Sequence, residues 1–249
     1  RLRWQLANAA QQPSLESLLV LREGRFYQTE DAPSGRFALE GSVQQLGFLN
    51  TFLPDAHGLS LSGGGQLVAE GEFADDRLIA PSHLRVEASP LEVQFLDYQA
   101  NGRGELTAQL FGPEDAQLTL SIPSFRLKGQ GDSRASLEGR HLTLTTTTQA
   151  VSRLMESQDP RHVTTRISLP IISVPDLSRY NNYLPDGAGI ALHGGEASLN
   201  SEMVLKGLDG TGDINLRAFG AELTLLDQRL KGDLTLNFKL TEGDLEQMR

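Results

Sequence analysis

The chain has 249 residues, a net charge of −10 and no cysteine. Its lysines and arginines are spread singly along the sequence, which argues against a nucleic-acid partner because binding to phosphates needs clustered bases. The absence of cysteine excludes disulfides, thiolate metal ligands and thiol nucleophiles.

Apolar and polar residues alternate with a period of two, which is the pattern of strands that have one face in an apolar environment. The clearest stretches are residues 84–88, 91–95, 118–122 and 234–240, and the threonine-rich segment 143–148 also suits a strand because its residues are β-branched. Pairs such as Asn101-Gly102 and Asp209-Gly210 predict hairpin turns or bulges between strands. Strands joined by successive hairpins predict a mainly β fold built as an antiparallel meander.

A few short helices are predicted between the strands, at residues 15–19, 43–52, 150–157 and 175–183. The second and the fourth each precede a Leu-Pro-Asp sequence, and we expect each to end there because proline disfavours helix in the residue before it. The helix at 150–157 is expected to end before Asp159-Pro160. For the first candidate an alternative stays open, in which residues 18–21 begin a strand instead.

An internal repeat appears when Val43 is aligned with Val174. Without a gap, Asn50 then falls on Asn181, and Gly63-Gly64 falls on Gly194-Gly195. A one-residue shift brings Leu84 onto Ile214 and Val86 onto Leu216, and a two-residue shift brings the segment 104–107 onto 232–235. The motif residues of the repeat are Leu53, Pro54, Asp55, Leu184, Pro185 and Asp186, which we interpret as structural turns that follow a helix.

The repeat predicts three divisions of the chain: residues 1–42 as part of a preceding repeat, 43–160 as one unit and 161–249 as a second unit that is truncated at its C-terminus. The sequence begins without Met or a signal peptide, so we expect it to be a piece of a longer protein.

Searching for chemistry gives no candidate catalytic residue, cofactor or metal site. The histidines are His57, His83, His141, His162 and His193, and none pairs with another at metal-ligand spacing. Neither a Gly-x-Ser-x-Gly nucleophile motif nor a dinucleotide-binding glycine motif is present. The sequence therefore predicts a protein that is not an enzyme.

The Leu/Thr/Gly-rich meanders, the short helix between sheet units, and phrases such as VLREGRF at 20–26 and GIALHGG at 189–195 resemble the AsmA-like proteins of Gram-negative envelopes, including the TamB, YhdP and YdbH types. The resemblance implies a curved sheet or open groove whose apolar concave face binds or conducts phospholipid acyl chains between the inner and outer membranes. It also implies a periplasmic location, with an inner-membrane anchor outside this sequence, and phospholipid or other acyl-chain lipids and envelope proteins as partners.

On this hypothesis the lipid-contacting residues would be Leu84, Val86, Val93, Phe95, Leu118, Leu120, Ile214, Leu216, Leu234, Leu236 and Phe238. The same residues would suit the core of a closed β-sandwich that serves as a non-enzymatic structural or interaction module of an envelope or surface assembly. Geometry separates the two hypotheses, because a groove one sheet thick supports lipid binding and a core sealed by a second sheet supports the module.

Overall fold

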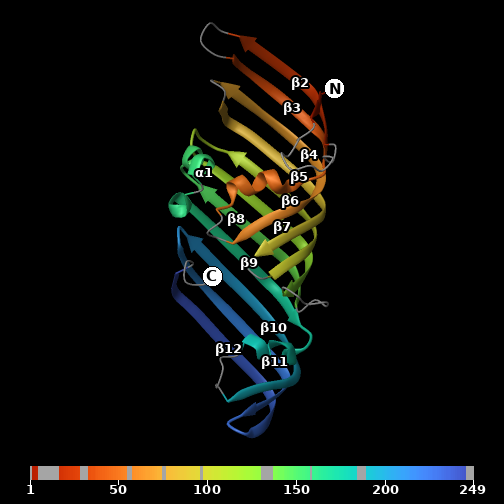
Figure 1. Cartoon of the computed structure of the whole chain (residues 1–249), viewed down its shortest axis with the longest axis vertical. Helices are drawn as coiled ribbons and strands as arrows, with labels where there is room; N and C mark the ends of the chain where they lie inside the picture. Colours follow the sequence, from red (N-terminus) through yellow and green to blue (C-terminus); the bar gives the residue numbers. More distant parts are fainter. Residues whose placement is uncertain are drawn as a thin grey trace, which may run out of the picture.

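The computed structural model of the chain describes residues 2–4, 17–28, 33–54, 58–74, 77–95, 98–129, 137–157, 159–183 and 189–244. Twelve strands form one sheet, in which each strand pairs antiparallel with its neighbours in sequence (Figure 1). The strands are β1 (Leu2–Trp4), β2 (Ser17–Gln28), β3 (Pro33–Val43), β4 (Leu59–Ala74), β5 (Arg77–Phe95), β6 (Tyr98–Leu110), β7 (Ala116–Gly129), β8 (Leu137–Thr148), β9 (Val163–Val174), β10 (Ile190–Lys206), β11 (Asp209–Leu225) and β12 (Gln228–Asp244). The predicted mainly β antiparallel meander is confirmed, and the sheet is curved and does not close into a barrel.

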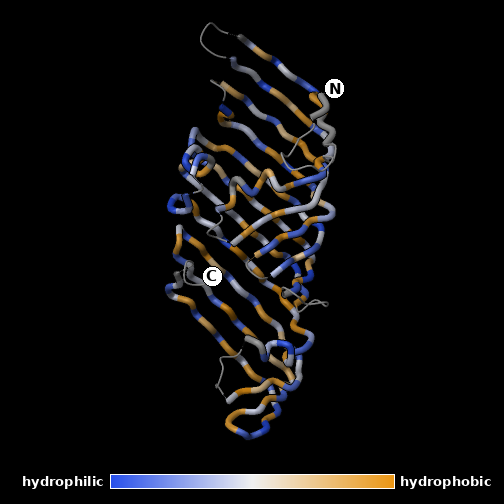
Figure 2. Tube along the Cα trace, viewed as in Figure 1, coloured by the Kyte–Doolittle hydropathy of each residue, from blue (hydrophilic) through white to orange (hydrophobic). Residues whose placement is uncertain are grey.

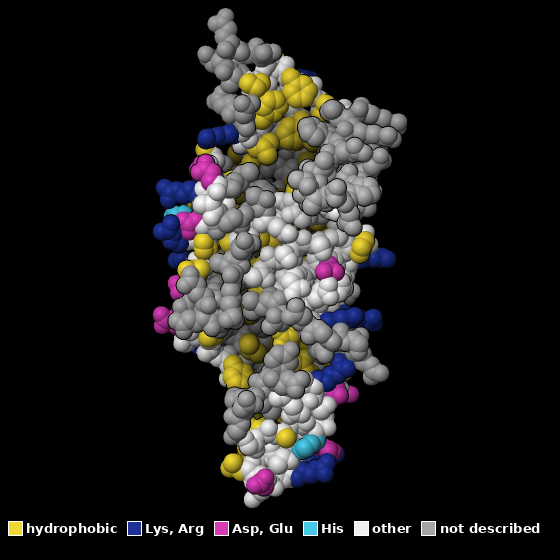
Figure 3. Space-filling view, viewed as in Figure 1, with side chains coloured by type: hydrophobic (Ala, Val, Ile, Leu, Met, Phe, Trp, Pro, Cys, Tyr) yellow, Lys and Arg dark blue, Asp and Glu magenta, His cyan; other side chains and the backbone are white. Residues whose placement is uncertain are grey.

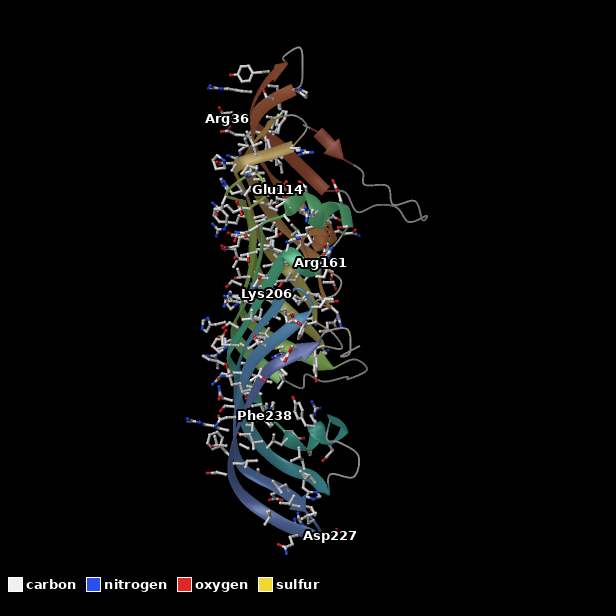
Figure 4. All side chains as sticks on the ribbon, turned by 90° about the vertical axis from the view of Figure 1, so that its left-hand side faces the viewer. Arg36, Glu114, Arg161, Lys206, Asp227 and Phe238 are labelled. Carbon is white, nitrogen blue, oxygen red and sulfur yellow. The ribbon has the colours of Figure 1, made fainter. Side chains whose placement is uncertain are left out.

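Short helical segments cover one face of the sheet: η1 (Leu46–Phe52), α1 (Val151–Ser157), η3 (Pro160–His162) and η4 (Leu177–Tyr183). In the side view they lie on the side toward which the strands curl, which we call the inner face (Figure 4). The opposite, outer face carries Arg36 (Figure 4). The predicted helices at 43–52, 150–157 and 175–183 are confirmed, although the first and third take the 3-10 form. In η1, Leu46 and Leu49 are three residues apart, a spacing that puts both on one side of a 3-10 turn.

Three details differ from the sequence-based expectations. Residues 18–21 lie in β2, so the alternative strand interpretation of this segment is correct. Asn101-Gly102 lies inside β6 rather than in a turn, and a Cβ on Gly102 would stand 2.8 Å from the Ser124 carbonyl oxygen of β7, so this glycine permits close strand packing. Asp209-Gly210 begins β11, because the turn before it is formed by residues 207–208.

Figure 2 shows hydrophobic and hydrophilic residues alternating along the strands. In β5 the alternation changes phase between Val86 and Val93, where a register irregularity separates Ala88 from Leu91. The one extra residue of this bulge turns the strand so that both apolar sets, which the sequence presents as two separate stretches, face the same side. One long strand therefore contributes two segments to a single apolar face.

The repeated asparagine has the same structural role in both units. The Asn50 side chain accepts a hydrogen bond from the Leu61 backbone N–H at 2.7 Å and donates one to the Leu61 carbonyl oxygen at 3.1 Å. Asn181 makes the same two bonds with Leu192, at 2.6 and 2.7 Å. Each asparagine thereby pairs with a strand residue as a neighbouring strand would, and it fixes η1 on β4 and η4 on β10. Leu53 and Pro54 of the first motif are buried, and Asp55, Leu184, Pro185 and Asp186 lie outside the described residues.

The N-terminus of α1 is capped by a carboxylate from the distant β6–β7 connection. Glu114 accepts hydrogen bonds from the Ser152 hydroxyl at 2.6 Å and from the Ser152 backbone N–H at 2.9 Å. These two bonds hold the pKa of Glu114 below its ordinary value. In the neighbouring η3, hydrogen bonds from the Arg161 side chain and backbone lower the pKa of Asp159 to about 2.

Acid is therefore expected to destabilise the fold through these carboxylates. A group whose pKa is lower in the folded state contributes stability above its unfolded pKa and loses that contribution as the pH falls through its folded value. We expect the urea concentration at the midpoint of unfolding to decrease as the pH is lowered from about 5 to about 2. Glu114→Gln is expected to reduce this pH dependence. A pH profile of Glu114→Gln that matches the unmodified chain would contradict the assigned role of Glu114.

The inner face as candidate functional site

Apolar side chains and glycines form continuous rows that cross the sheet on its inner face. One row follows directly paired residues from β3 to β12: Gly41, Leu67, Val86, Leu106, Leu120, Leu144, Ile167, Met203, Gly212 and Leu240. Strands in a sheet lie about 4.8 Å apart, so a row of this kind extends for roughly 40 Å before curvature is considered. Because the row crosses the boundary between the two repeats, the inner face is one surface rather than two.

The central part of this face is closed. Leu46, Leu49 and Leu53 of the η1 region are 0%, 0% and 1% exposed, and they share one core cluster with strands β3 to β10. Leu154 of α1 is 1% exposed on the same side. The short helical segments therefore act as the cover of the central strands, where a second sheet would stand in a sandwich.

The eleven residues predicted to contact lipid divide into three groups. Val86, Val93, Leu118 and Leu120 are buried in the central core, and in this structure they contact protein rather than an open groove. Leu84, Phe95, Leu216 and Leu236 are half-buried. Ile214, Leu234 and Phe238 are 37%, 37% and 57% exposed, so of the eleven predicted residues these three are the well-exposed ones.

A comparison of the two repeat units shows how the closed part of the inner face differs from the open part. Val86 pairs with Leu106 across β5 and β6, and Leu216 pairs with Leu236 across β11 and β12. This register places Leu106 on Leu236, so the two-residue shift that aligns segment 104–107 with 232–235 is wrong by two residues. The error arises because strand pairing, rather than local sequence similarity, decides which positions correspond.

With the corrected correspondence, small residues of the closed unit are replaced by large ones in the open unit. Gly104 and Ala108 of β6 correspond to Leu234 and Phe238 of β12. A Cβ on Gly104 would stand 2.7 Å from Leu91, because neighbouring side chains fill the space above β6. In β12 the same face carries bulky side chains that remain exposed, and no atom lies within 4 Å of a Cβ placed on Gly232.

A second open region, which the sequence analysis missed, lies near the N-terminal end of the face. Phe26 and Leu78 are 61% and 53% exposed. Phe26 and Phe73 flank Gly35 in paired positions of β2, β3 and β4, and their ring centroids are 5.9 Å apart. Figure 3 shows hydrophobic side chains gathered at this end of the molecule. The aromatic residues spaced around glycines in β2 to β4 were a signal in the sequence for this surface.

Hydroxyl groups interrupt the apolar face near the boundary between its closed and open parts. Thr146 and Thr165 are buried, and their Oγ1 atoms lie 3.0 Å apart, within hydrogen-bond distance. Ser201 is 4% exposed, and its Oγ atom has no hydrogen-bond partner among the described residues. Ser201 pairs directly with Ile214. A polar atom of a molecule bound in the open region could therefore form a hydrogen bond with the Ser201 hydroxyl.

The outer face is mainly polar, although Val68, Ile171 and Phe219 are also exposed on it, and several of its charges form ion pairs. Arg36 lies 2.6 Å from Glu72, Arg85 lies 2.6 Å from Glu105, and Asn215 donates to Asn200 at 2.9 Å. A shallow depression of about 480 Å³ over β2 to β5 is lined mainly by such residues. Exposed ion pairs of this kind contribute little to stability and keep a face hydrated.

Within the described residues, no group of three or more His, Asp or Glu side chains is placed to hold a metal ion. No helix in the described part of the chain is long and apolar enough to cross a membrane. No protein-family model, curated protein or solved structure matches the chain. The inner face is therefore the candidate site on the strength of its own geometry.

Proposed function

We propose that this chain is a periplasmic segment of a Gram-negative envelope protein, and that its inner face binds or conducts phospholipid acyl chains between the inner and outer membranes. The observation that carries the proposal is the exposed apolar surface of β11 and β12, where Ile214, Leu234 and Phe238 face away from the hydrated side of a single sheet. The resemblance to AsmA-like envelope proteins supports the location and the class of cargo.

The physical argument concerns the cost of leaving this surface in water. Phe238 is 57% exposed and Phe26 is 61% exposed, and they lie in the two open regions on either side of the closed central part of the inner face. Each methylene group that leaves water contributes about 0.8 kcal/mol, so an acyl chain can be held there without specific polar contacts. A β-sandwich module is less well supported, because all the described strands belong to one sheet and none stands opposite it.

Replacement of Phe238 by a photo-crosslinking amino acid tests the proposal directly. We expect adducts with phospholipid from Phe238 and from Leu234, because both side chains are exposed on the inner face. Asn237 is the matched control, since it lies between them on β12 and alternation turns it to the outer face. Equal labelling at 237 and 238, or no lipid adduct at either inner position in cells, would refute lipid binding and favour the structural module.

A charged substitution gives a second measurement. Phe238→Glu is expected to reduce the phospholipid retained in native mass spectra severalfold, because an ionised carboxylate opposes contact with an acyl chain. Asn237→Glu adds the same charge to the opposite face and is expected to leave retention unchanged. Both positions are exposed, so both variants are expected to unfold at the same urea concentration as the unmodified chain.

A further inference from the structure

We propose that the Ser201 hydroxyl on the inner face donates a hydrogen bond to an ester carbonyl oxygen of a bound acyl lipid, and that it makes this surface prefer acyl esters to ether-linked lipids. The inference rests on the proposed function, because it names the chemical class of the lipid that the same surface takes. Ser201 lies in β10 and pairs directly with Leu169 of β9 and with Ile214 of β11. It is therefore an interior position of the sheet, with a paired strand on each side.

The Ser201 side chain is buried without a hydrogen-bond partner. It is 4% exposed, and its Oγ atom is the one buried side-chain oxygen or nitrogen in the described part of the chain that has no partner. The buried hydroxyls of Thr146 and Thr165, by contrast, lie 3.0 Å apart and can bond to each other. A buried hydroxyl without a partner has lost its bonds to water and gained none, so it destabilises the fold. Binding of a molecule that supplies an acceptor would remove this cost.

The first unit has no hydroxyl at the corresponding position. Leu84 of the first unit corresponds to Ile214, and the residues paired with them on the preceding strand are Ala69 and Ser201. Alanine and serine differ by one oxygen atom, so the second unit carries a hydroxyl where the first unit is built without one. The repeated fold does not require this hydroxyl, and we infer that it serves binding.

The residues around Ser201 favour a neutral acceptor. Ser201 is the only polar residue on the inner face of the paired segments 197–205, 212–218 and 234–240, whose other inner-face residues are apolar or glycine. No lysine or arginine of these segments stands on that face to neutralise a phosphate, and an ionised group costs far more to bury than a neutral one. The neutral acceptors of an acyl lipid are its ester carbonyl oxygens, which lie next to the acyl chains. A hydrogen bond at Ser201 would therefore leave the chains on the exposed apolar surface of β11 and β12.

The side chains beside Ser201 leave a route to its hydroxyl. Its neighbours on the inner face are half-buried or exposed: Leu169, Leu199, Met203 and Ile214. A methionine side chain is unbranched and adapts easily to its surroundings, so Met203 can move aside when an ester group enters. A bound lipid can therefore reach the hydroxyl by displacing side chains alone.

Competition between an ester lipid and its ether analogue tests the inference. Diacyl and dialkyl phosphatidylglycerol of equal chain length differ only in the two carbonyl groups, and native mass spectrometry of the chain with equal amounts of both gives the ratio retained. We expect the unmodified chain to retain about three to ten times more ester than ether lipid, the ratio that one neutral hydrogen bond supplies.

Two serine variants assign the preference to one hydroxyl. Ser201→Ala is expected to retain the two lipids equally, with retention of the ether lipid unchanged, because only the ester uses the hydroxyl. Ser198→Ala is the matched control, since Ser198 is exposed on the outer face of the same strand, and it is expected to keep the full preference for the ester.

The outcomes separate this inference from the proposed function. Retention of neither lipid would refute lipid binding as a whole, and this inference with it. Equal retention of both lipids by the unmodified chain, or an ester preference that survives Ser201→Ala, would overturn the role of Ser201 and leave the proposed function standing.

Urea unfolding supplies a second readout on Ser201→Ala. A hydroxyl without a partner contributes nothing to the fold, so the variant without lipid is expected to unfold at the same urea concentration as the unmodified chain or at a higher one. A lower midpoint would show that the hydroxyl serves the fold, and would overturn its assignment to lipid binding.

Discussion

Leu106→Ala is expected to lower the free energy of unfolding by about 2 to 5 kcal/mol, the range observed when a fully buried leucine is truncated in a well-packed core. Leu106 is 0% exposed, and it stands between Val86 and Leu120 in the row that crosses the sheet. Its neighbours are held by strand pairing on both sides, so they cannot move in to fill the space. The measurement is urea unfolding followed by circular dichroism.

Leu236→Ala is the matched control, because Leu236 occupies the corresponding position in the second unit and is only half-buried. We expect this substitution to cost about 1 kcal/mol or less, since part of the side chain is in water in the folded chain as well. Equal losses at the two positions would mean that the second unit is closed over in solution, and would remove the exposed surface on which lipid binding rests.

Asn50→Ala is expected to destabilise the chain by about 2 kcal/mol, because it leaves both backbone groups of Leu61 without their side-chain partner. Leu61 is 2% exposed, so water has little access to replace the lost bonds. The structural consequence should be release of η1 from β4. Hydrogen exchange at the Leu61 amide is the direct readout, and we expect its protection to be lost.

Asn181→Ala removes the same pair of bonds in the second unit, where the asparagine is exposed. Water can take over the two bonds there, and we expect a loss of about 1 kcal/mol or less. Asn101→Ala, on an exposed position of β6, controls for removal of an asparagine as such. An effect at Asn50 no larger than that at Asn101 would show that the side-chain pairing does not fix η1.

The repeated Leu-Pro-Asp motif correctly marked the end of a helical segment. It did not indicate which residue of the repeat has the same structural role in both copies. Leu53 and Pro54 are buried beside η1, as expected of a structural turn. That residue is the asparagine three positions before the motif, which in both copies attaches the helical segment to the following strand. Its function was hidden in the sequence because it bonds to backbone groups of the next strand, and backbone groups have no sequence signature.

Prediction of the inner face succeeded for its composition and failed for its exposure. The two-residue alternation of Leu84, Val86, Leu234 and Leu236 identified which side chains share a face, since alternate residues of a strand must point the same way. Alternation carries no information about what lies above that face. Val86 became core because η1 and α1 fold back over the central strands, whereas Phe238 remained exposed because no described element covers β12.

The sequence by itself determined that this protein is a mainly β antiparallel meander with a duplicated unit, because hydrophobic period, turn residues and repeated spacing are all local properties. Tertiary structure decided which part of the apolar face is closed, which positions of the two units correspond, and that all the described strands join in one sheet. Those features depend on strand register and on the path of short covering helices. Both are set by contacts between residues far apart in the chain, so a local pattern cannot encode them.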